Sequence, residues 1–128
     1  MGNRAVIVND RAMCAEDKCI YLHWNGGKDS VTAFLRAAKE LGMRFESNED
    51  KLAFAEMLAE RFFECKVGLT VYFEDYGRAD TDNGDNGVFV VDDDFELVGR
   101  IYAPIQEQEN EEKSQEIYEY LVGWEKAA

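Results

Sequence analysis

The segment from Cys19 to Val31 constrains the fold more than any other part of this chain. Its first six residues alternate between two faces, as the residues of a half-buried β-strand do. Gly26 and Gly27 follow and allow a tight turn. A helical apolar pattern then begins at Val31. A strand that turns directly into a helix favours a fold in which helices pack against a sheet.

The other elements follow from the same kinds of pattern. Apolar runs predict further strands at 4–8, 69–74, 88–91 and 95–102, and apolar residues at helical spacing predict helices at 29–41, 47–63 and 108–124. Asp29 or Ser30 can cap the first helix, Gly42 can end it, and Ser47 with Asp50 suits a capping box on the second.

Short connections predict how the strands pair. The first two strands have no helix between them, and the strands at 88–91 and 95–102 are joined by the acidic turn 92–94, so each pair is expected to form an antiparallel hairpin. We therefore predict a single α+β domain over residues 1–128. It should contain a mainly antiparallel sheet of about five strands and three helices on one side, in the order ββααβββα.

Acidic residues are concentrated in the second half of the chain. The formal net charge is −13; residues 72–119 hold 15 acids and 3 bases, whereas residues 1–71 hold 11 acids and 10 bases. Such a surface repels nucleic-acid phosphates and anionic lipids, and it attracts basic protein surfaces. The charge argues against direct binding to nucleic acid or to a membrane, although a general need for solubility also explains it.

We expect these acids to meet on one surface of the folded protein. Carboxylates spaced along a surface can imitate the phosphates of a duplex and occupy the basic channel of a nucleic-acid-binding protein. The predicted partner-binding residues are Glu74, Asp75, Asp80, Asp82, Asp85, Asp92, Asp93, Asp94, Glu96, Glu107, Glu109, Glu111 and Glu112. Five tyrosines are candidates either for interface anchors or for half-buried packing: Tyr72, Tyr76, Tyr102, Tyr118 and Tyr120.

In size and charge the chain resembles small acidic proteins of phages and mobile elements, such as anti-restriction and anti-CRISPR inhibitors. That resemblance implies an inhibitor of a nucleic-acid-binding defence protein, which acts by charge mimicry of nucleic acid. The expected partner is a basic protein surface, and no cofactor is expected. The sequence leaves open whether the chain forms homo-oligomers.

The turn Asn-Gly-Gly-Lys-Asp-Ser at 25–30 resembles the Ser-Gly-Gly-x-Asp-Ser loop of the PP-loop ATP pyrophosphatases, with Asn25 in place of the first serine. The resemblance covers six residues. It implies a parallel, doubly wound sheet and an enzyme that binds a nucleotide through Gly26, Gly27, Lys28, Asp29 and Ser30. A Gly-Gly turn before Asp-Ser also suits any strand-to-helix connection, because it supplies the turn and the cap.

Neither group of potential metal ligands has a suitable spacing. The stretch 80–87 is rich in Asp, Asn and Gly, but registers that start at Asp80 or Asp82 do not match the ligand positions of an EF-hand. Asx-Gly turns explain its composition instead. The second group lacks the paired spacing of zinc ligands: Cys14, Cys19, His23 and Cys65. We expect no bound metal.

Three classes of function follow from the sequence. A non-enzymatic acidic protein-binding module is the first, a nucleotide-binding enzyme that uses the 25–30 loop is the second, and a structural or oligomerising domain is the third. The single histidine limits general acid–base schemes, so no catalytic residue is predicted. Three cysteines and no recognisable signal peptide predict reduced thiols in the cytoplasm.

Overall fold

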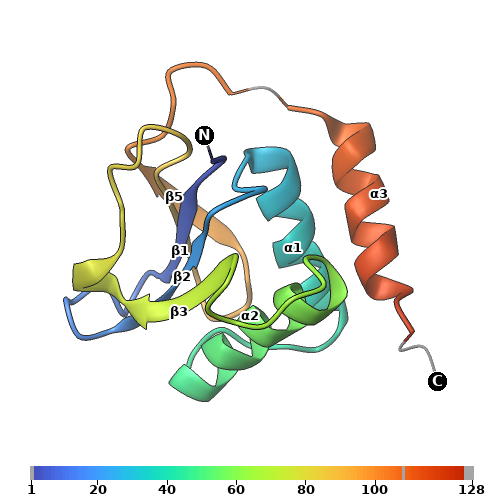
Figure 1. Ribbon diagram of the computed structural model, residues 1–128, viewed down its shortest axis with the longest axis horizontal. Helices are drawn as coiled ribbons and strands as arrows, with labels where there is room; N and C mark the ends of the chain where they lie inside the picture. The colour runs from blue at the N-terminus through green and yellow to red at the C-terminus, as the bar shows by residue number, and fades with distance from the viewer. Residues whose placement is uncertain (1, 108, 126–128) are drawn as a thin grey trace.

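One mixed sheet with helices on one side of it forms the framework of the protein (Figure 1). The computed structural model describes residues 2–107 and 109–125. Within these residues the elements are β1 (Ala5–Asn9), β2 (Lys18–Leu22), α1 (Lys28–Glu40), α2 (Asn48–Arg61), β3 (Val71–Asp75), the short 3-10 helix η1 (Tyr76–Arg78), β4 (Val88–Val91), β5 (Leu97–Ile101) and α3 (Glu111–Val122). The predicted α+β class and the order ββααβββα are confirmed.

The central strand of the sheet is β1. The strand order is β3-β2-β1-β4-β5. The pairs β1–β2, β2–β3 and β4–β5 are antiparallel, which confirms a mainly antiparallel sheet and both predicted hairpins. Only β1 and β4 are parallel, with Val6 opposite Val88. The sequence did not predict this pair, because nothing in the long segment between the two strands specifies how they meet.

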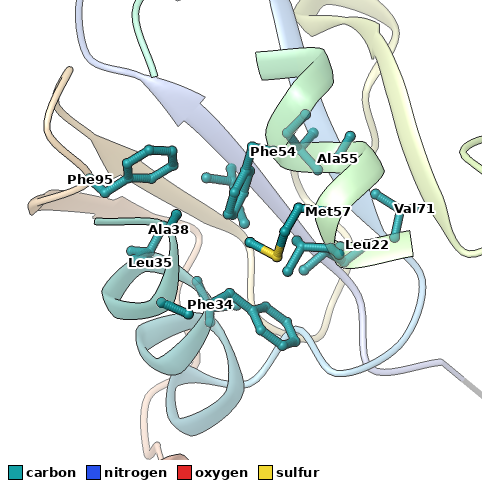
Figure 2. Close-up of a cluster of buried hydrophobic side chains, with 14 of the residues drawn as sticks. Leu22, Phe34, Leu35, Ala38, Phe54, Ala55, Met57, Val71 and Phe95 are labelled. Atoms are coloured by element: carbon teal, nitrogen blue, oxygen red, sulfur yellow. The ribbon is translucent and has the colours of Figure 1, made fainter. Parts of the chain in front are cut away.

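The main hydrophobic core lies between the sheet and the helices α1 and α2. Figure 2 shows Phe34 of α1 and Phe54 of α2 among buried side chains from the strands. Phe45, Phe54 and Phe95 form a cluster with ring centroids 5.0–5.6 Å apart. Aromatic rings of this size bury the most apolar area per residue. The cluster therefore joins α2 to the loops at 45 and 95.

The other face of the sheet is covered by loops. Its buried residues are Val6, Val8, Cys19, Val88 and Val90, against which Met13, Tyr76 and Ala79 pack. The loops at 10–17 and 76–87 supply these covering side chains. They are tied together where Gly77 N donates to Ala15 O at 2.9 Å. All five residues of β1 are buried as a result.

Two of the predicted helix boundaries are confirmed, and one is corrected. Ser47 and Asp50 form the predicted capping box at the start of α2, and Gly42 follows α1 with a φ of +76°, a conformation that favours glycine. The N-cap of α1, however, is Gly27 and it makes no side-chain hydrogen bond. Asp29 lies inside the first turn, where its Oδ1 accepts from Ser30 N at 2.7 Å.

Two further predicted boundaries differ from the structure. The strand β3 begins at Val71 rather than at Leu69, whose side chain is 65% exposed, because residues 67–70 form a turn with Gly68 at a φ of +104°. The helix α3 begins at Glu111 because the Asn110 side chain caps it by accepting from Lys113 N at 3.0 Å. The predicted start at residue 108 lies outside the described residues.

Truncation of Phe54 tests the core. Phe54 is fully buried in the aromatic cluster, so Phe54→Ala should lower the free energy of unfolding by about 3–5 kcal/mol, since it removes apolar burial and leaves a cavity. Leu69→Ala is the matched control and should change it by less than about 0.5 kcal/mol, because Leu69 is exposed. Urea denaturation followed by circular dichroism measures both. Equal losses in the two variants would contradict this description of the core.

Candidate functional site

The strand register places the predicted acidic residues at two ends of the sheet. The strand β4 crosses the sheet from one end to the other, so the segment before Val88 and the segment after Val91 lie at opposite ends. The loop that holds Asp80, Asp82 and Asp85 lies at the first end, to which β5 returns before residues 107–112. The turn 92–96 lies at the second end, together with Asp75 at the end of β3. The expected single surface is therefore divided.

Basic residues pair with four of the seven predicted acids at the first end, and two of these bases, Arg4 and Lys28, come from the first half of the chain. Arg4 binds Asp85 through Nε at 2.8 Å and Asp80 through Nη1 at 3.3 Å. Lys28 Nζ lies 2.6 Å from Glu109 Oε1, and Arg100 pairs with Glu107. These contacts join segments more than 75 residues apart in sequence, apart from the Arg100 pair.

The second end shows the same pairing. Arg44 contacts Asp94 at 2.9 Å, and Lys18 contacts Asp75 at 2.7 Å. Arg11 pairs with Asp93, and Lys39 pairs with Glu96. Eight of the thirteen predicted residues thus have a basic partner. The described residues contain no ion pair to the other five: Glu74, Asp82, Asp92, Glu111 and Glu112. The charge asymmetry of the sequence is largely offset in space.

The acids without a basic partner among the described residues are most regularly arranged on α3. Glu112, Glu116 and Glu119 are exposed, and no basic residue in the described part of the chain pairs with them. Their i, i+4, i+7 spacing places them on one stripe, opposite the buried pair Ile117 and Leu121. We call these three residues the α3 acidic stripe. The sequence prediction missed Glu116 and Glu119, although their spacing in a predicted helix could have identified them.

The turn at 25–30 and the loop at 80–87 line one pocket at the first end of the sheet. This pocket has a volume of about 450 Å³. It is lined by Asn3, Gly27, Lys28, Asp29, Gly84, Asp85, Asn86, Pro104, Gln106, Glu107 and Lys113. The start of β1 holds both loops, because Asn3 O accepts from Gly26 N at 2.8 Å and Asn3 Oδ1 accepts from Asn86 Nδ2 at 2.6 Å.

The loop at 80–87 is held closed by hydrogen bonds from its own side chains. Asn83 is 4% exposed, its Oδ1 accepts from Asp85 N and Gly87 N, and its Nδ2 donates to Asp80 O. These Asx turns explain the composition that suggested a calcium loop. Within residues 2–107 and 109–125 no three His, Cys, Asp or Glu residues are grouped as a metal site would require.

The two glycines of the 25–30 turn have different roles. A Cβ atom on Gly26 would lie 2.6 Å from Asn3 O and 2.8 Å from Ala5 N, so the approach to β1 requires glycine there. A Cβ on Gly27 would meet only the flexible side chains of Asp29, at 3.1 Å, and Asn3, at 3.6 Å. Its φ of −66° suits any residue. Gly27 thus leaves the pocket open at the start of α1 without a packing reason.

The charges around this pocket do not favour an anion. Asp29, Asp85 and Glu107 line it together with the two lysines Lys28 and Lys113. A hydrogen bond to Glu109 raises the pKa of Lys28 and also holds its ammonium group. The Asp29 carboxylate accepts from Ser30 N and lies 3.6 Å from Lys113. Negative groups of the protein therefore already occupy the positions that a phosphate would need.

The fold also departs from the one that the PP-loop resemblance implies. The strand before the turn, β2, is antiparallel to both of its neighbours, β1 and β3. A parallel, doubly wound sheet is therefore wrong for this chain. The local strand–turn–helix order arises here in a hairpin-based sheet, because Gly26 packs against the start of β1 and directs the chain onto the helix-covered face.

The cysteines and the histidine have structural surroundings. All three cysteines are free, and burial raises the pKa of Cys19 to about 12, so its thiol stays protonated and unreactive. His23 Nδ1 lies 3.1 Å from Tyr21 Oη, and its ring packs edge-on against Trp24. Of the five candidate tyrosines, Tyr102 and Tyr120 are exposed and the others are partly buried.

No protein-family model matches this chain, and no curated protein or solved structure matches it. In the described part of the chain, no helix is long and apolar enough to span a bilayer. Functional inference therefore rests on the geometry and charge of the surfaces described above.

Substituting alanine for each glycine of the 25–30 turn tests whether that glycine is needed for packing or only keeps the pocket open. Gly26→Ala should lower the free energy of unfolding by about 1–3 kcal/mol, because its Cβ collides with the backbone of β1. Gly27→Ala should change it by less than about 1 kcal/mol, since only two flexible side chains must move. Urea denaturation measures both. A larger loss for Gly27→Ala would show that Gly27 also serves packing.

The Arg4–Asp85 pair makes stability depend on pH. Its hydrogen bond lowers the pKa of Asp85, so the ionised pair stabilises the fold above about pH 4, the ordinary aspartate value, and this contribution disappears as pH falls through the lower folded pKa. Asp85→Asn should be less stable by about 1 kcal/mol at pH 7, and its stability should fall less steeply below about pH 4. Urea titrations across pH test this, with Asp82→Asn as the unpaired control; identical pH profiles for wild type and Asp85→Asn would contradict it.

Proposed function

We propose that this protein is a non-enzymatic, acidic protein-binding module that inhibits a basic, nucleic-acid-binding protein by charge mimicry of nucleic acid. The observation that carries the proposal is the α3 acidic stripe, Glu112, Glu116 and Glu119. No basic residue in the described part of the chain pairs with these carboxylates, and Glu119 Oε1 accepts a hydrogen bond from the neutral Gln115 Nε2 at 3.0 Å. A basic groove would neutralise them.

Two features of the stripe oppose the stability of α3. Glu112 and Glu116 are like charges at i, i+4, an arrangement that costs an isolated helix about 0.2–0.5 kcal/mol. Glu119 lies in the last turn, which holds no basic residue and where the helix dipole disfavours a negative charge. Glu112 itself lies in the first turn, where the dipole favours an acid, and Glu119 accepts from Gln115 Nε2 at 3.0 Å. The Glu112–Glu116 repulsion and the position of Glu119 nevertheless oppose helix stability, which supports a role outside the fold of the chain itself.

The helix is held firmly enough to present the stripe. Ile117 and Leu121 are buried in the main core, against α1. Arg36 of α1 stacks on Tyr118 at 4.0 Å from its ring centroid. Arg61 of α2 donates to Leu121 O at 3.0 Å. A rigid acidic surface loses little conformational entropy on binding, which favours affinity.

The chemistry of the partner follows from the same surface. The net charge of −13 disfavours nucleic acid itself and favours a protein whose surface is basic. Tyr120 lies beside the stripe and is 49% exposed, and tyrosine at such a position is a frequent interface anchor. With three free thiols in the chain, we propose the reducing cytoplasm as the place of action.

A nucleotide-binding enzyme is the second candidate, because the pocket opens at Gly27 without a packing reason. The carboxylates in its lining favour the first proposal instead. Calorimetry with ATP and Mg²⁺ distinguishes the two. We expect no binding heat at millimolar ATP, whereas saturable heat that Gly27→Ala removes would support the enzyme.

Charge removal on α3 tests the proposal. The triple variant of Glu112→Gln, Glu116→Gln and Glu119→Gln should weaken capture of basic proteins from a bacterial lysate by about tenfold or more, because it removes the unpaired stripe. Changing Glu40, Glu49 and Glu56 to Gln alters net charge equally at other exposed sites and is the matched control. Capture is measured by quantitative mass spectrometry at low and high salt.

The result has clear alternatives. Specific capture should decline as ionic strength rises, since salt screens exposed charges. Equal loss in both triple variants would show that only net charge matters. Recovery of no basic or nucleic-acid-handling protein at low salt would overturn the proposed function.

A further inference from the structure

Another pocket lies on the loop-covered face of the sheet, over the strands β2 and β3. It has a volume of about 270 Å³ and is lined by Tyr21, Tyr72, Glu74, Arg78 and Asp80. Pockets for drug-sized ligands usually measure about 300–1,000 Å³, so this space suits a smaller chemical group. We call it the tyrosine pocket.

The register of β2 and β3 builds the floor of the tyrosine pocket. Tyr21 is opposite Tyr72, and Cys19 is opposite Glu74. Residues two apart on a strand share a face, so both tyrosines and Glu74 lie on the face that the loops cover. The two tyrosine ring centroids are 5.6 Å apart, and Tyr21 Oη lies 3.1 Å from His23 Nδ1. Two aromatic rings with a carboxylate beside them therefore form this floor.

The Glu74 carboxylate is partly buried and lacks a partner. In the described part of the chain its side chain makes no ion pair and no hydrogen bond, whereas the neighbouring Asp75 binds Lys18 at 2.7 Å. Burial raises the pKa of Glu74, and the carboxylates of Asp75 and Asp80 raise it further. A partly desolvated carboxylate without a nearby cation is unfavourable. A cation supplied from outside the chain would relieve it.

The charged residues at the rim of the pocket do not neutralise Glu74. Asp80 is exposed and already binds Arg4 Nη1 at 3.3 Å. Arg78 is exposed, and no ion pair in the described residues joins it to Glu74. Apart from burial, the groups that shift the pKa of Glu74 are both acids. The unmatched charge at the floor of the pocket is therefore that of Glu74.

A guanidinium group matches this floor better than an ammonium group does. It is planar and stacks on aromatic rings, and its fork of N–H donors binds a carboxylate through two parallel hydrogen bonds. An ammonium group is compact and strongly hydrated, so it gains less from a ring face. The chain itself stacks guanidinium groups on rings, because Arg36 lies 4.0 Å from the Tyr118 centroid and Arg100 lies 3.8 Å from that of Phe89.

We propose that the tyrosine pocket binds a guanidinium group, as carried by arginine. The rings of Tyr21 and Tyr72 receive its flat face, and the Glu74 carboxylate accepts hydrogen bonds from its edge. Two sources share this chemistry: an arginine side chain of another protein and the free amino acid.

This site is separate from the α3 acidic stripe. The helix α3 packs against α1, on the other side of the sheet, and Figure 1 shows β3 and α3 at opposite sides of the molecule. The inference therefore goes beyond the proposed function and does not depend on it. The triple variant of the stripe should bind a guanidinium as the wild type does, so a failure of either proposal leaves the other standing.

The first test titrates the full chain with Nα-acetyl-arginine amide and follows the protein by NMR. Saturable shifts at Tyr21, Tyr72 and Glu74 are expected in the millimolar range. Nα-acetyl-lysine amide carries the same charge without the planar fork and should bind more weakly, by about threefold or more. Equal affinity for the two amides, or no saturable shift with either, would overturn the proposal.

Variants of the floor locate the site. Glu74→Gln removes the charge and nearly preserves the shape, so it should weaken binding of the arginine amide by about tenfold or more. Glu40→Gln removes the same charge at an exposed site on α1 and is the matched control. The NMR spectra check that both variants fold. Equal affinities in the two variants would show that only net charge acts and would overturn the proposal.

The contribution of the rings is tested at Tyr72. Tyr72→Leu should weaken binding by about two- to fivefold, because it removes one aromatic face. Tyr72→Phe keeps that face and should bind as the wild type does. A loss in Tyr72→Phe equal to that in Tyr72→Leu would contradict stacking on the ring.

Arg78 provides the last test. Arg78→Gln removes a like charge at the rim and should strengthen binding of the arginine amide by less than about fivefold. A larger gain would show that Arg78 itself fills the pocket and would overturn the proposal. The α-carboxylate of free L-arginine can contact Arg78. Tighter binding of the free amino acid, lost in Arg78→Gln, would identify it as the ligand, whereas equal or tighter binding of the amide would identify a protein side chain.

Discussion

The burial of β1 on both of its faces is the constraint on which the rest of this structure depends. All five of its residues are buried, with the helices on one side and the loops at 10–17 and 76–87 on the other. The backbone N–H and C=O groups of a buried strand need hydrogen-bond partners along both of its edges, and β1 pairs with β2 and β4. The two residues just before it, Asn3 and Arg4, also anchor the Gly26 turn and the Asn86 loop. The pocket between those loops is thus a consequence of how β1 is enclosed.

The same enclosure explains why an asymmetric sequence gives a largely paired surface. Folding brings bases of the first half, such as Arg4 and Lys28, against acids of the second half, such as Asp85 and Glu109. Exposed pairs of this kind contribute little stability individually. Their main effect is to restrict the free negative charge to a few places, of which α3 is the most regular. We propose that a partner recognises this acidic stripe rather than a diffuse field.

The α3 acidic stripe offers charge without hydrogen-bonding backbone, because the helix satisfies its own amides. Electrostatics mainly sets encounter rates and selects partners.

The sequence by itself determined the elements, their order and the hairpins, because periodicity, the Ser47–Asp50 box and the short turns are local signals. It also identified both loops that line the pocket, although as separate motifs. Only the tertiary structure decided the parallel β1–β4 pair, the opposite ends of the acids and the edge position of β5. These depend on contacts between residues far apart in the chain, and local patterns carry no information about which distant segments meet. Whether an acid such as Asp85 or Glu116 is neutralised depends on the same long-range contacts.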